Sequence, residues 1–272
     1  MKRILVPTDF SDTANNALQF AADLAKKNNA EIVLLHVYHV PVIDVYTSAT
    51  YIEEMQKEQE KESLQKLDAI VTELTKGGII ADSISKPGFL ADEIELIEEK
   101  EEVDFIVMGT TGASGALASL IGSNAARAIE KSTVPIMVVP HEARNKQYKK
   151  IGYAYDFVDV DVTSLGSLAD FAQPYSADVL VMHVKDEAHF RFKDEEKILA
   201  DAGKKYGNVN FSFAEIKDTD IADALNECIE EEDLDLLVMT HHHRTFFEKL
   251  FHKSLTKKMA YHTNIPLLVY HG

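Results

Sequence analysis

The stretch Met108–Ser123 (MGTTGASGALASLIGS) has the composition of an anion-binding loop. It follows an apolar run, 103–107, whose length suits a buried strand. A helix is expected to begin after it, with Ser123 as the N-cap. Between strand and helix lie the glycines Gly109, Gly112, Gly115 and Gly122. Missing side chains expose backbone N–H groups, and a helix N-terminus favours negative charge, so we expect this loop to bind a group such as phosphate.

The loop differs from the lysine-containing phosphate loop of many nucleotide-hydrolysing enzymes. No Lys or Arg follows Met108 until Arg127, so the GxxxxGK[ST] pattern is absent. The donors to a bound phosphate are therefore expected to be main-chain amides and the Ser123 hydroxyl.

Composition limits the classes of partner. The 272 residues carry a net charge of −17, which argues against a nucleic-acid or anionic-membrane partner because both require a basic surface. The single cysteine, Cys228, allows no internal disulfide and fits a reducing compartment. The amino-terminal apolar run is too short for a signal peptide, and no later run is long enough to span a bilayer. We therefore expect a cytoplasmic protein of two domains.

The elements that must position the loop are strands alternating with helices. Apolar runs that predict buried strands occur at 4–7, 30–38, 79–85, 103–107 and 134–139, and helical spacing fills the intervals between them. This alternation predicts an α/β fold with a parallel sheet. Ligands of such sheets bind outside the carboxyl ends of the strands. Asp9, Val37 and Gly109 all fall at those ends, so we expect them to converge on one crevice.

The pattern then repeats. Residues 151–157 match 4–10 at an offset of 147, which pairs Asp156 with Asp9, and at an offset of 131 Ser254 matches Ser123. We infer a duplication with domains 1–140 and 151–272 joined by a polar linker, 141–150. The second copy has side chains where the first has glycines: Thr240, His243 and Lys253 stand against Gly109, Gly112 and Gly122. It is not expected to hold a nucleotide in the same way.

The spacing G-x2-G-x9-G-S, formed by Gly109, Gly112, Gly122 and Ser123, resembles the nucleotide-binding signature of the universal stress protein family. The opening ILVPTDFS, the strand end LLHV and the closing strand VPIMVVP resemble the same family. The resemblance covers essentially the whole chain as a tandem pair, with one intact and one degenerate motif. It implies two tandem open α/β sandwich domains of the adenine nucleotide alpha hydrolase-like type. Each would have a five-stranded, mostly parallel sheet, and the domains would pair through their last strands.

The resemblance also implies binding of ATP or a related adenine nucleotide, with Mg as a candidate accompanying ion. According to the resemblance, different residues would contact the adenosine, the ribose and the phosphates. The adenosine would lie beside Pro7, Thr8 and Asp9, with its adenine edge at the Val37 backbone. The ribose would be lined by Met108 and Gly109, and the phosphates would be held by Gly112, Gly122, Ser123 and Asn124.

The favoured function is a regulatory or stress-response protein that senses ATP or AMP through its first domain and is not an enzyme. No Walker lysine, adenylylation motif or Ser-His-acid arrangement is visible. Two alternatives stay open: a nucleotide-independent dimeric scaffold, and a weak metal-assisted ATPase in which Asp9 positions a cation. The sequence leaves homodimer formation and the protein partner undecided.

Several residues also have plain structural interpretations. The glycines can be turn residues and Asp9 a helix-start carboxylate. His36 recurs as His183 in the second copy and is interpreted as a hydrogen-bonded core histidine, and Cys228 as a core residue. The triplet His241–His243 suggests a metal site. We disfavour this because consecutive histidines cannot all face one point in regular structure, and no acid or cysteine completes a ligand spacing.

Overall fold

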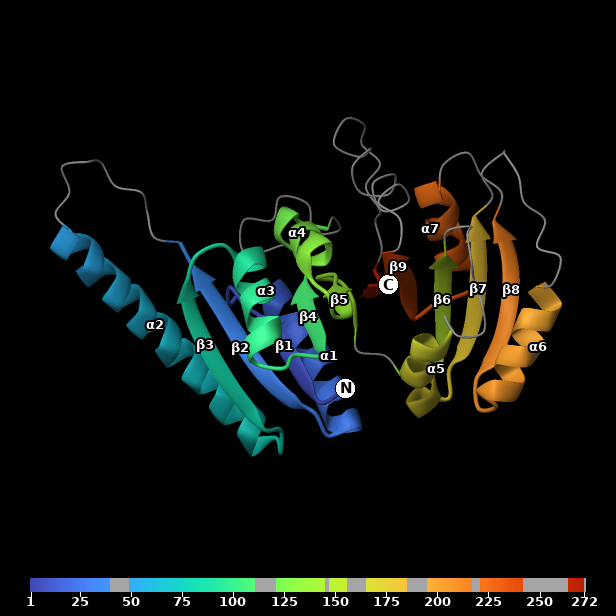
Figure 1. Cartoon of the computed structure of the whole chain (residues 1–272), viewed down its shortest axis with the longest axis horizontal. Helices are drawn as coiled ribbons and strands as arrows, with labels where there is room; N and C mark the ends of the chain where they lie inside the picture. Colours follow the sequence, from blue (N-terminus) through green and yellow to red (C-terminus); the bar gives the residue numbers. More distant parts are fainter. Residues whose placement is uncertain are drawn as a thin grey trace. The chain divides into compact units, whose positions relative to one another are not determined.

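The computed structural model describes residues 1–39, 49–110, 121–144, 147–155, 165–184, 195–216, 221–241 and 264–271. The chain forms two compact units, Met1–His141 and Glu142–Gly272 (Figure 1). Each unit contains a parallel five-stranded sheet with helices in the connections between its strands. The predicted fold of two tandem α/β domains is therefore confirmed.

The first unit has the strand order β3-β2-β1-β4-β5, and all of its strand pairs are parallel. Its elements are β1 (Arg3–Pro7), α1 (Asp12–Asn28), β2 (Glu31–Tyr38), α2 (Ala49–Lys76), β3 (Ala81–Pro87), α3 (Leu90–Lys100), β4 (Phe105–Gly109), α4 (Ser123–Lys131) and β5 (Ile136–Val139). The chain progresses outward from β1 to β3 and then crosses to β4 on the other side of β1. This reversal between β1 and β4 is the position where open α/β sheets bind ligands.

Helices cover both faces of this sheet. Helix α1 packs on β1 and β4, α2 packs on β2 and β3, and α3 packs against α4. Figure 1 shows α3 and α4 in front of the sheet and α1 behind it, as right-handed crossover connections require. The central strands are consequently buried on both faces, and Ile4, Leu5, Ile106 and Val107 are fully buried. A strand that is buried on both faces needs apolar residues at nearly every position, which explains the near-continuous apolar sequence of these strands.

The second unit has the same topology. Its strand order, β8-β7-β6-β9-β10, corresponds strand by strand to that of the first unit, and its pairs are again parallel. Its elements are β6 (Lys150–Tyr155), α5 (Gly166–Ala172), the 3-10 helix η1 (Gln173–Tyr175), β7 (Asp178–Val184), α6 (Glu195–Lys205), β8 (Asn210–Ile216), α7 (Ile221–Glu231), β9 (Leu236–His241) and β10 (Leu267–His271). Among the described residues of both units, no helix combines the length and apolar character that crossing a membrane would require.

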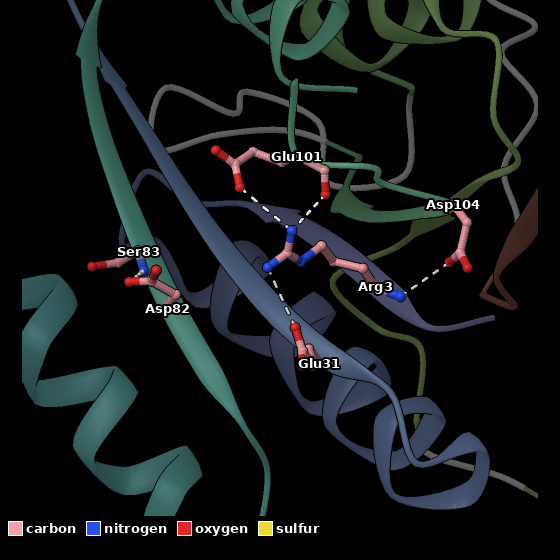
Figure 2. A network of polar contacts seen from close by, with 6 residues as sticks. All are labelled: Arg3, Glu31, Asp82, Ser83, Glu101 and Asp104. Carbon is pink, nitrogen blue, oxygen red and sulfur yellow. Dashed lines mark hydrogen bonds and ion pairs between the residues drawn. The ribbon is translucent and has the colours of Figure 1, made fainter. Parts of the chain in front are cut away.

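A polar clamp fastens the amino end of β1, at the other end of the strand from Pro7 (Figure 2). The Asp104 carboxylate accepts hydrogen bonds from the main-chain N–H groups of Lys2 at 2.6 Å and Arg3 at 3.2 Å. The Arg3 Nη1 donates to the Glu101 carbonyl at 2.7 Å, and its Nη2 lies 3.4 Å from Glu31 Oε2. The clamp thus ties β1 to β2 and to the turn that precedes β4.

The second unit repeats the core of this clamp. Asp235 accepts from the N–H groups of Lys149 at 2.9 Å and Lys150 at 3.1 Å, and Lys150 Nζ donates to the Glu232 carbonyl at 2.8 Å. These residues correspond to Asp104, Lys2, Arg3 and Glu101 at the offsets of 147 and 131 found in the sequence. Because both copies keep the clamp and only one keeps the glycines, we assign the clamp to the fold and not to ligand binding.

Candidate functional site

A cavity of about 760 Å³ opens in the first unit at the carboxyl ends of β1, β2 and β4. Its lining residues are Pro7, Thr8, Asp9, Ala14, Val37, His39, Phe89, Leu90, Ala91, Asp92, Met108, Gly109, Thr110, Gly122, Ser123, Asn124, Arg127, Glu130 and Lys131. The structure therefore brings together the sequence-predicted site residues Pro7, Thr8, Asp9, Val37, Met108, Gly109, Gly122, Ser123 and Asn124. Gly112 lies outside the described residues. That the predicted site residues contact a nucleotide stays a prediction.

The turn after β1 presents Asp9 to this cavity. The Thr8 N–H donates to the Leu35 carbonyl at 2.8 Å, which extends the strand pairing by one residue, and the Phe10 N–H donates to Thr8 Oγ1 at 3.0 Å. Phe10 has a φ of +64°, a left-handed conformation that costs free energy for a residue with a side chain. The sharp turn leaves Asp9 exposed, with Oδ1 accepting from the Ser11 N–H at 3.1 Å.

His36 supports this turn from β2. Its Nδ1 lies 2.8 Å from the Thr8 carbonyl oxygen, and since a carbonyl can only accept, Nδ1 carries the proton. The imidazole centroid is 4.5 Å from the Phe10 ring. The contacts agree with the interpretation of His36 as a hydrogen-bonded structural residue, and they fix the backbone that carries Asp9.

Gly109, the last residue of β4, is required by helix packing. A Cβ built there would lie 2.8 Å from Thr13 Cγ2 and 3.2 Å from the Thr13 carbonyl oxygen in α1. Contacts that short force a neighbour to move. We predicted that this glycine leaves main chain bare for a ligand; the structure shows that its missing side chain makes room for α1. Gly109 still lines the cavity through its backbone.

The amino end of α4 faces the cavity without a side-chain cap. Gly122, and not Ser123 as we predicted, is the N-cap: it is extended at φ −68° and ψ 162°, and its N–H donates to the Thr110 carbonyl at 2.6 Å. The first helical acceptor is the Gly122 carbonyl, which receives the Ala126 N–H at 3.0 Å. The N–H groups of 123–125 thus have no acceptor within the helix, and such an end attracts anions.

Thr110 provides a second polar group in the same wall. Its side chain is 4% exposed, and among the described residues its Oγ1 has no hydrogen-bond partner. Buried hydroxyls in folded proteins are normally paired. This unpaired, buried hydroxyl belongs to the residue whose carbonyl accepts from the Gly122 N–H at the uncapped helix end.

Comparison with known proteins establishes the family. The family model described as the universal stress protein family matches residues 1–140 and 147–271. The chain belongs to the universal stress protein family. Both halves match, which agrees with the duplication inferred from the sequence.

Individual relatives of this universal stress protein include single-domain and tandem forms. A universal stress protein of Methanocaldococcus jannaschii is 35% identical over 141 residues, covering 51% of this chain and 81% of the relative. One from Synechocystis is 26% identical and aligns over 99% of this chain and 100% of its own length. The crystal structure of a universal stress protein from Archaeoglobus fulgidus covers 99% of this chain and 96% of its own at 22% identity with a TM-score of 0.70, a likeness that shows the shared fold.

Two cations on α4 line the cavity of this universal stress protein and were missed by sequence reasoning. Arg127 and Lys131 follow Ser123 at intervals of four residues, which places all three on one helix face; that spacing was the available signal. Lys131 Nζ bonds the carboxylates of Asp92 and Glu95, and these hydrogen bonds raise the pKa of Lys131. Arg127 has no ion-pair partner within the described part of the chain, so its charge is available to a ligand.

Sequence reasoning also missed His39 and Phe89, two aromatic residues in the lining. They follow the carboxyl ends of β2 and β3, which lie side by side in the sheet. The rings contact each other with their centroids 5.3 Å apart and their planes at 64°. No chemical motif marks them, since their proximity depends on the pairing of the two strands.

The second unit has side-chain contacts where the first has glycine. Thr240, which matches Gly109, has its Oγ1 2.9 Å from the hydroxyl of Tyr153. Tyr153 is buried, and burial raises the pKa of its hydroxyl. The positions that match Gly112 and Gly122 lie outside the described residues.

The remaining candidates from the sequence lie elsewhere. Cys228 is half-buried with Sγ 3.4 Å from Met182 Sδ, and burial, followed by the charges of Glu232 and Glu231, raises the pKa of its thiol. A raised pKa disfavours the reactive thiolate, in agreement with a packing role. Of the histidine triplet, His242 and His243 lie outside the described residues. The described residues contain no group of three His, Cys, Asp or Glu side chains arranged to hold a metal ion.

Proposed function

We propose that this protein is a stress-response binding protein whose first unit binds ATP or a related adenine nucleotide. The observation that carries the proposal is the composition of one cavity. An uncapped helix N-terminus, an unpaired buried hydroxyl and an exposed carboxylate line the same hollow at the reversal of strand order. The volume of about 760 Å³ lies within the range typical of small-molecule sites.

The two ends of the cavity suit the two ends of a nucleotide. Main-chain N–H groups at 123–125, together with Arg127, would hold the phosphates. The exposed Asp9 carboxylate can accept hydrogen bonds from ribose hydroxyls or from an exocyclic amino group. Thr110, whose carbonyl accepts from the Gly122 N–H, lines the same cavity.

We propose that the site binds without rapid turnover. Phosphoryl transfer depends on cations fixed at the transferring phosphate, and in the described lining Lys131 is held by Asp92 and Glu95. A magnesium ion would arrive coordinated to the phosphates of the nucleotide. Nucleotide occupancy would then act as a signal through changes in what the protein binds.

The first test is the identity of the bound molecule. Freshly purified full-length protein is denatured, and the released small molecules are separated by chromatography. We expect an adenine nucleotide at close to one per chain. Protein that releases none and shows no heat of binding with millimolar ATP would refute the proposal and favour a nucleotide-independent scaffold. Steady release of phosphate from ATP would refute the non-enzymatic part alone.

A variant that copies the second unit tests the location. Gly122→Lys introduces the residue that stands at position 253. The extended backbone of Gly122, at φ −68° and ψ 162°, accepts any side chain, so we expect unchanged folding. The lysine side chain would occupy space at the helix end where phosphate must approach, and ATP binding should be lost in calorimetry. Affinity equal to that of the wild type would place the ligand elsewhere.

A further inference from the structure

Phe89 occupies a position that is energetically unfavourable for a phenylalanine. It lines the cavity with 62% of its surface exposed, although a large apolar side chain gains free energy from burial. It is also the N-cap of α3, where it makes no side-chain hydrogen bond. Ser, Thr, Asp and Asn are preferred at that position because they accept from the first helical N–H groups. A residue that violates two local rules at a cavity indicates a functional requirement.

The duplicated copy shows what the position contains when that requirement is absent. At the offset of 131, Phe89 corresponds to Asp220, which is a favourable N-cap residue. At the offset of 147, His39 corresponds to Asp186. The copy that has lost the glycine signature therefore also lacks both aromatic residues. The aromatic pair and the glycine loop occur together in the first unit.

The backbone places the two rings beside each other. Strands β2 and β3 stay in parallel register as far as Tyr38 and Pro87, and the Gly88 N–H then donates to the Tyr38 carbonyl at 3.1 Å. Gly88 has a φ of +148°, and a Cβ there would lie 3.1 Å from Glu93 Oε1. This glycine lets the chain turn abruptly from β3 into α3, so that Phe89 lies beside His39, which follows β2.

We propose that Phe89, held against His39, is the platform on which the base of the bound nucleotide stacks, and that it selects ligands carrying a purine ring. This inference rests on the proposed nucleotide-binding function and names its specificity-determining residue. Val37 on β2 and Met108 on β4 line the same cavity as the exposed ring. Stacking would cover the ring that the free protein exposes.

The expected effect is large enough to measure. Removing one aromatic partner of a stacked base weakens binding by roughly 5- to 150-fold. A purine presents a larger π-face than a pyrimidine, so ATP should bind more tightly than CTP in the wild type. A polyphosphate without a base makes no use of the platform, and its affinity should not depend on Phe89.

The test compares three substitutions in the full-length chain by calorimetry with ATP and with inorganic tripolyphosphate. Phe89→Ala and Phe89→Asn should each weaken ATP binding within that range and leave tripolyphosphate binding unchanged, and Phe89→Tyr should bind ATP like the wild type. Phe89→Asn is the matched control for folding, because asparagine restores a helix cap and should give a Tm no lower than that of the wild type.

The outcomes separate this inference from the proposed function. Wild-type protein that binds ATP, together with Phe89→Asn protein that binds it within twofold of the wild type, would overturn the platform and leave nucleotide binding intact. An equal loss of ATP and tripolyphosphate affinity in Phe89→Asn would also overturn it. Wild-type protein with no affinity for ATP would overturn both.

A spectroscopic test uses the absence of tryptophan from the chain. Phe89→Trp introduces a single indole that can stack on the base in place of the phenyl ring. Saturating ATP should quench its fluorescence, and saturating tripolyphosphate should leave it unchanged. Fluorescence indifferent to saturating ATP would contradict stacking at this position.

Discussion

At the scale of single residues, the charge of Arg127 is what allows a lining rich in carboxylates to bind an anionic ligand. The carboxylates of Asp9, Asp92 and Glu130 are part of the lining, and Lys131 is engaged by Asp92 and Glu95. A ligand with several phosphates therefore needs the helix end and Arg127 to offset this negative charge. Charged hydrogen bonds of this kind each contribute about 1.5–3 kcal/mol, less where water screens them.

We predict that Arg127→Gln weakens ATP binding by about 5- to 20-fold, because it removes a charge-assisted bond to phosphate. The dependence of affinity on salt concentration should fall with it. The matched control is Lys131→Gln, which removes a cation that other carboxylates already hold, and its effect should be smaller. Titrations at two ionic strengths measure both. A larger loss in Lys131→Gln would contradict this division of roles.

Gly109 is required because Thr13 of the neighbouring helix α1 packs closely against it. Gly109→Ala should lower the free energy of unfolding by about 1–3 kcal/mol, because the new Cβ would overpack against Thr13. Adding Thr13→Ser, which removes the contacting methyl group, should recover part of the loss. Gly203→Ala is the control: nothing lies within 4 Å of its Cβ in helix α6, so it should stabilise the protein by about 0.5–1 kcal/mol. Denaturant unfolding measures all three.

At the scale of elements, the sequence was informative wherever one segment determined its own structure. The predicted strand at 30–38 is β2 (Glu31–Tyr38), and the interval of helical spacing between the predicted strands 79–85 and 103–107 contains α3 (Leu90–Lys100). Apolar runs and helical spacing suffice for such elements. Ser is a preferred N-cap residue type, and the N-cap of α1 is Ser11, whose side chain accepts from the Ala14 N–H at 3.2 Å.

Prediction failed where the answer depended on contact between elements. The use of Gly109 depends on how closely α1 approaches β4, and the cap of α4 depends on the bond from Gly122 to Thr110. The aromatic pair His39 and Phe89 depends on the pairing of β2 with β3. None of these relations has a signature in the local sequence. The structure nevertheless places every predicted site residue that it describes in one cavity lining, because parallel strands must bring their carboxyl ends together; their contacts to a ligand stay a prediction.

The clamp at the amino ends of the strands gives a prediction at this scale. Asp104→Asn and Asp235→Asn each replace a carboxylate that accepts from two main-chain N–H groups, and each should cost about 1–2 kcal/mol. Hydrogen exchange should show faster opening of the first unit in Asp104→Asn and of the second in Asp235→Asn. ATP affinity should stay unchanged in both, since the clamp lies at the other end of the strands. A loss of affinity in Asp104→Asn would contradict the assignment.

At the scale of the whole molecule, the two units share the same backbone framework. Backbone details recur in both: Asn29 and Ser176 have φ of 51°, and Glu102 and Asp233 have φ of 51° and 49°. Each pair corresponds by the offsets of the duplication. The turns that terminate helices have therefore been retained with the clamp, whereas the glycines and aromatic residues of the first cavity have no equivalents in the second.

The position of the clamp has a consequence for substitutions. In the first unit, the residues of the clamp lie at one end of the strands, and the residues that line the cavity lie at the other. Substitutions at the recognition end that leave the packing of the helices unchanged are therefore expected to keep a unit folded. The second unit accordingly keeps its clamp and its sheet although Thr240 stands where the first unit has Gly109.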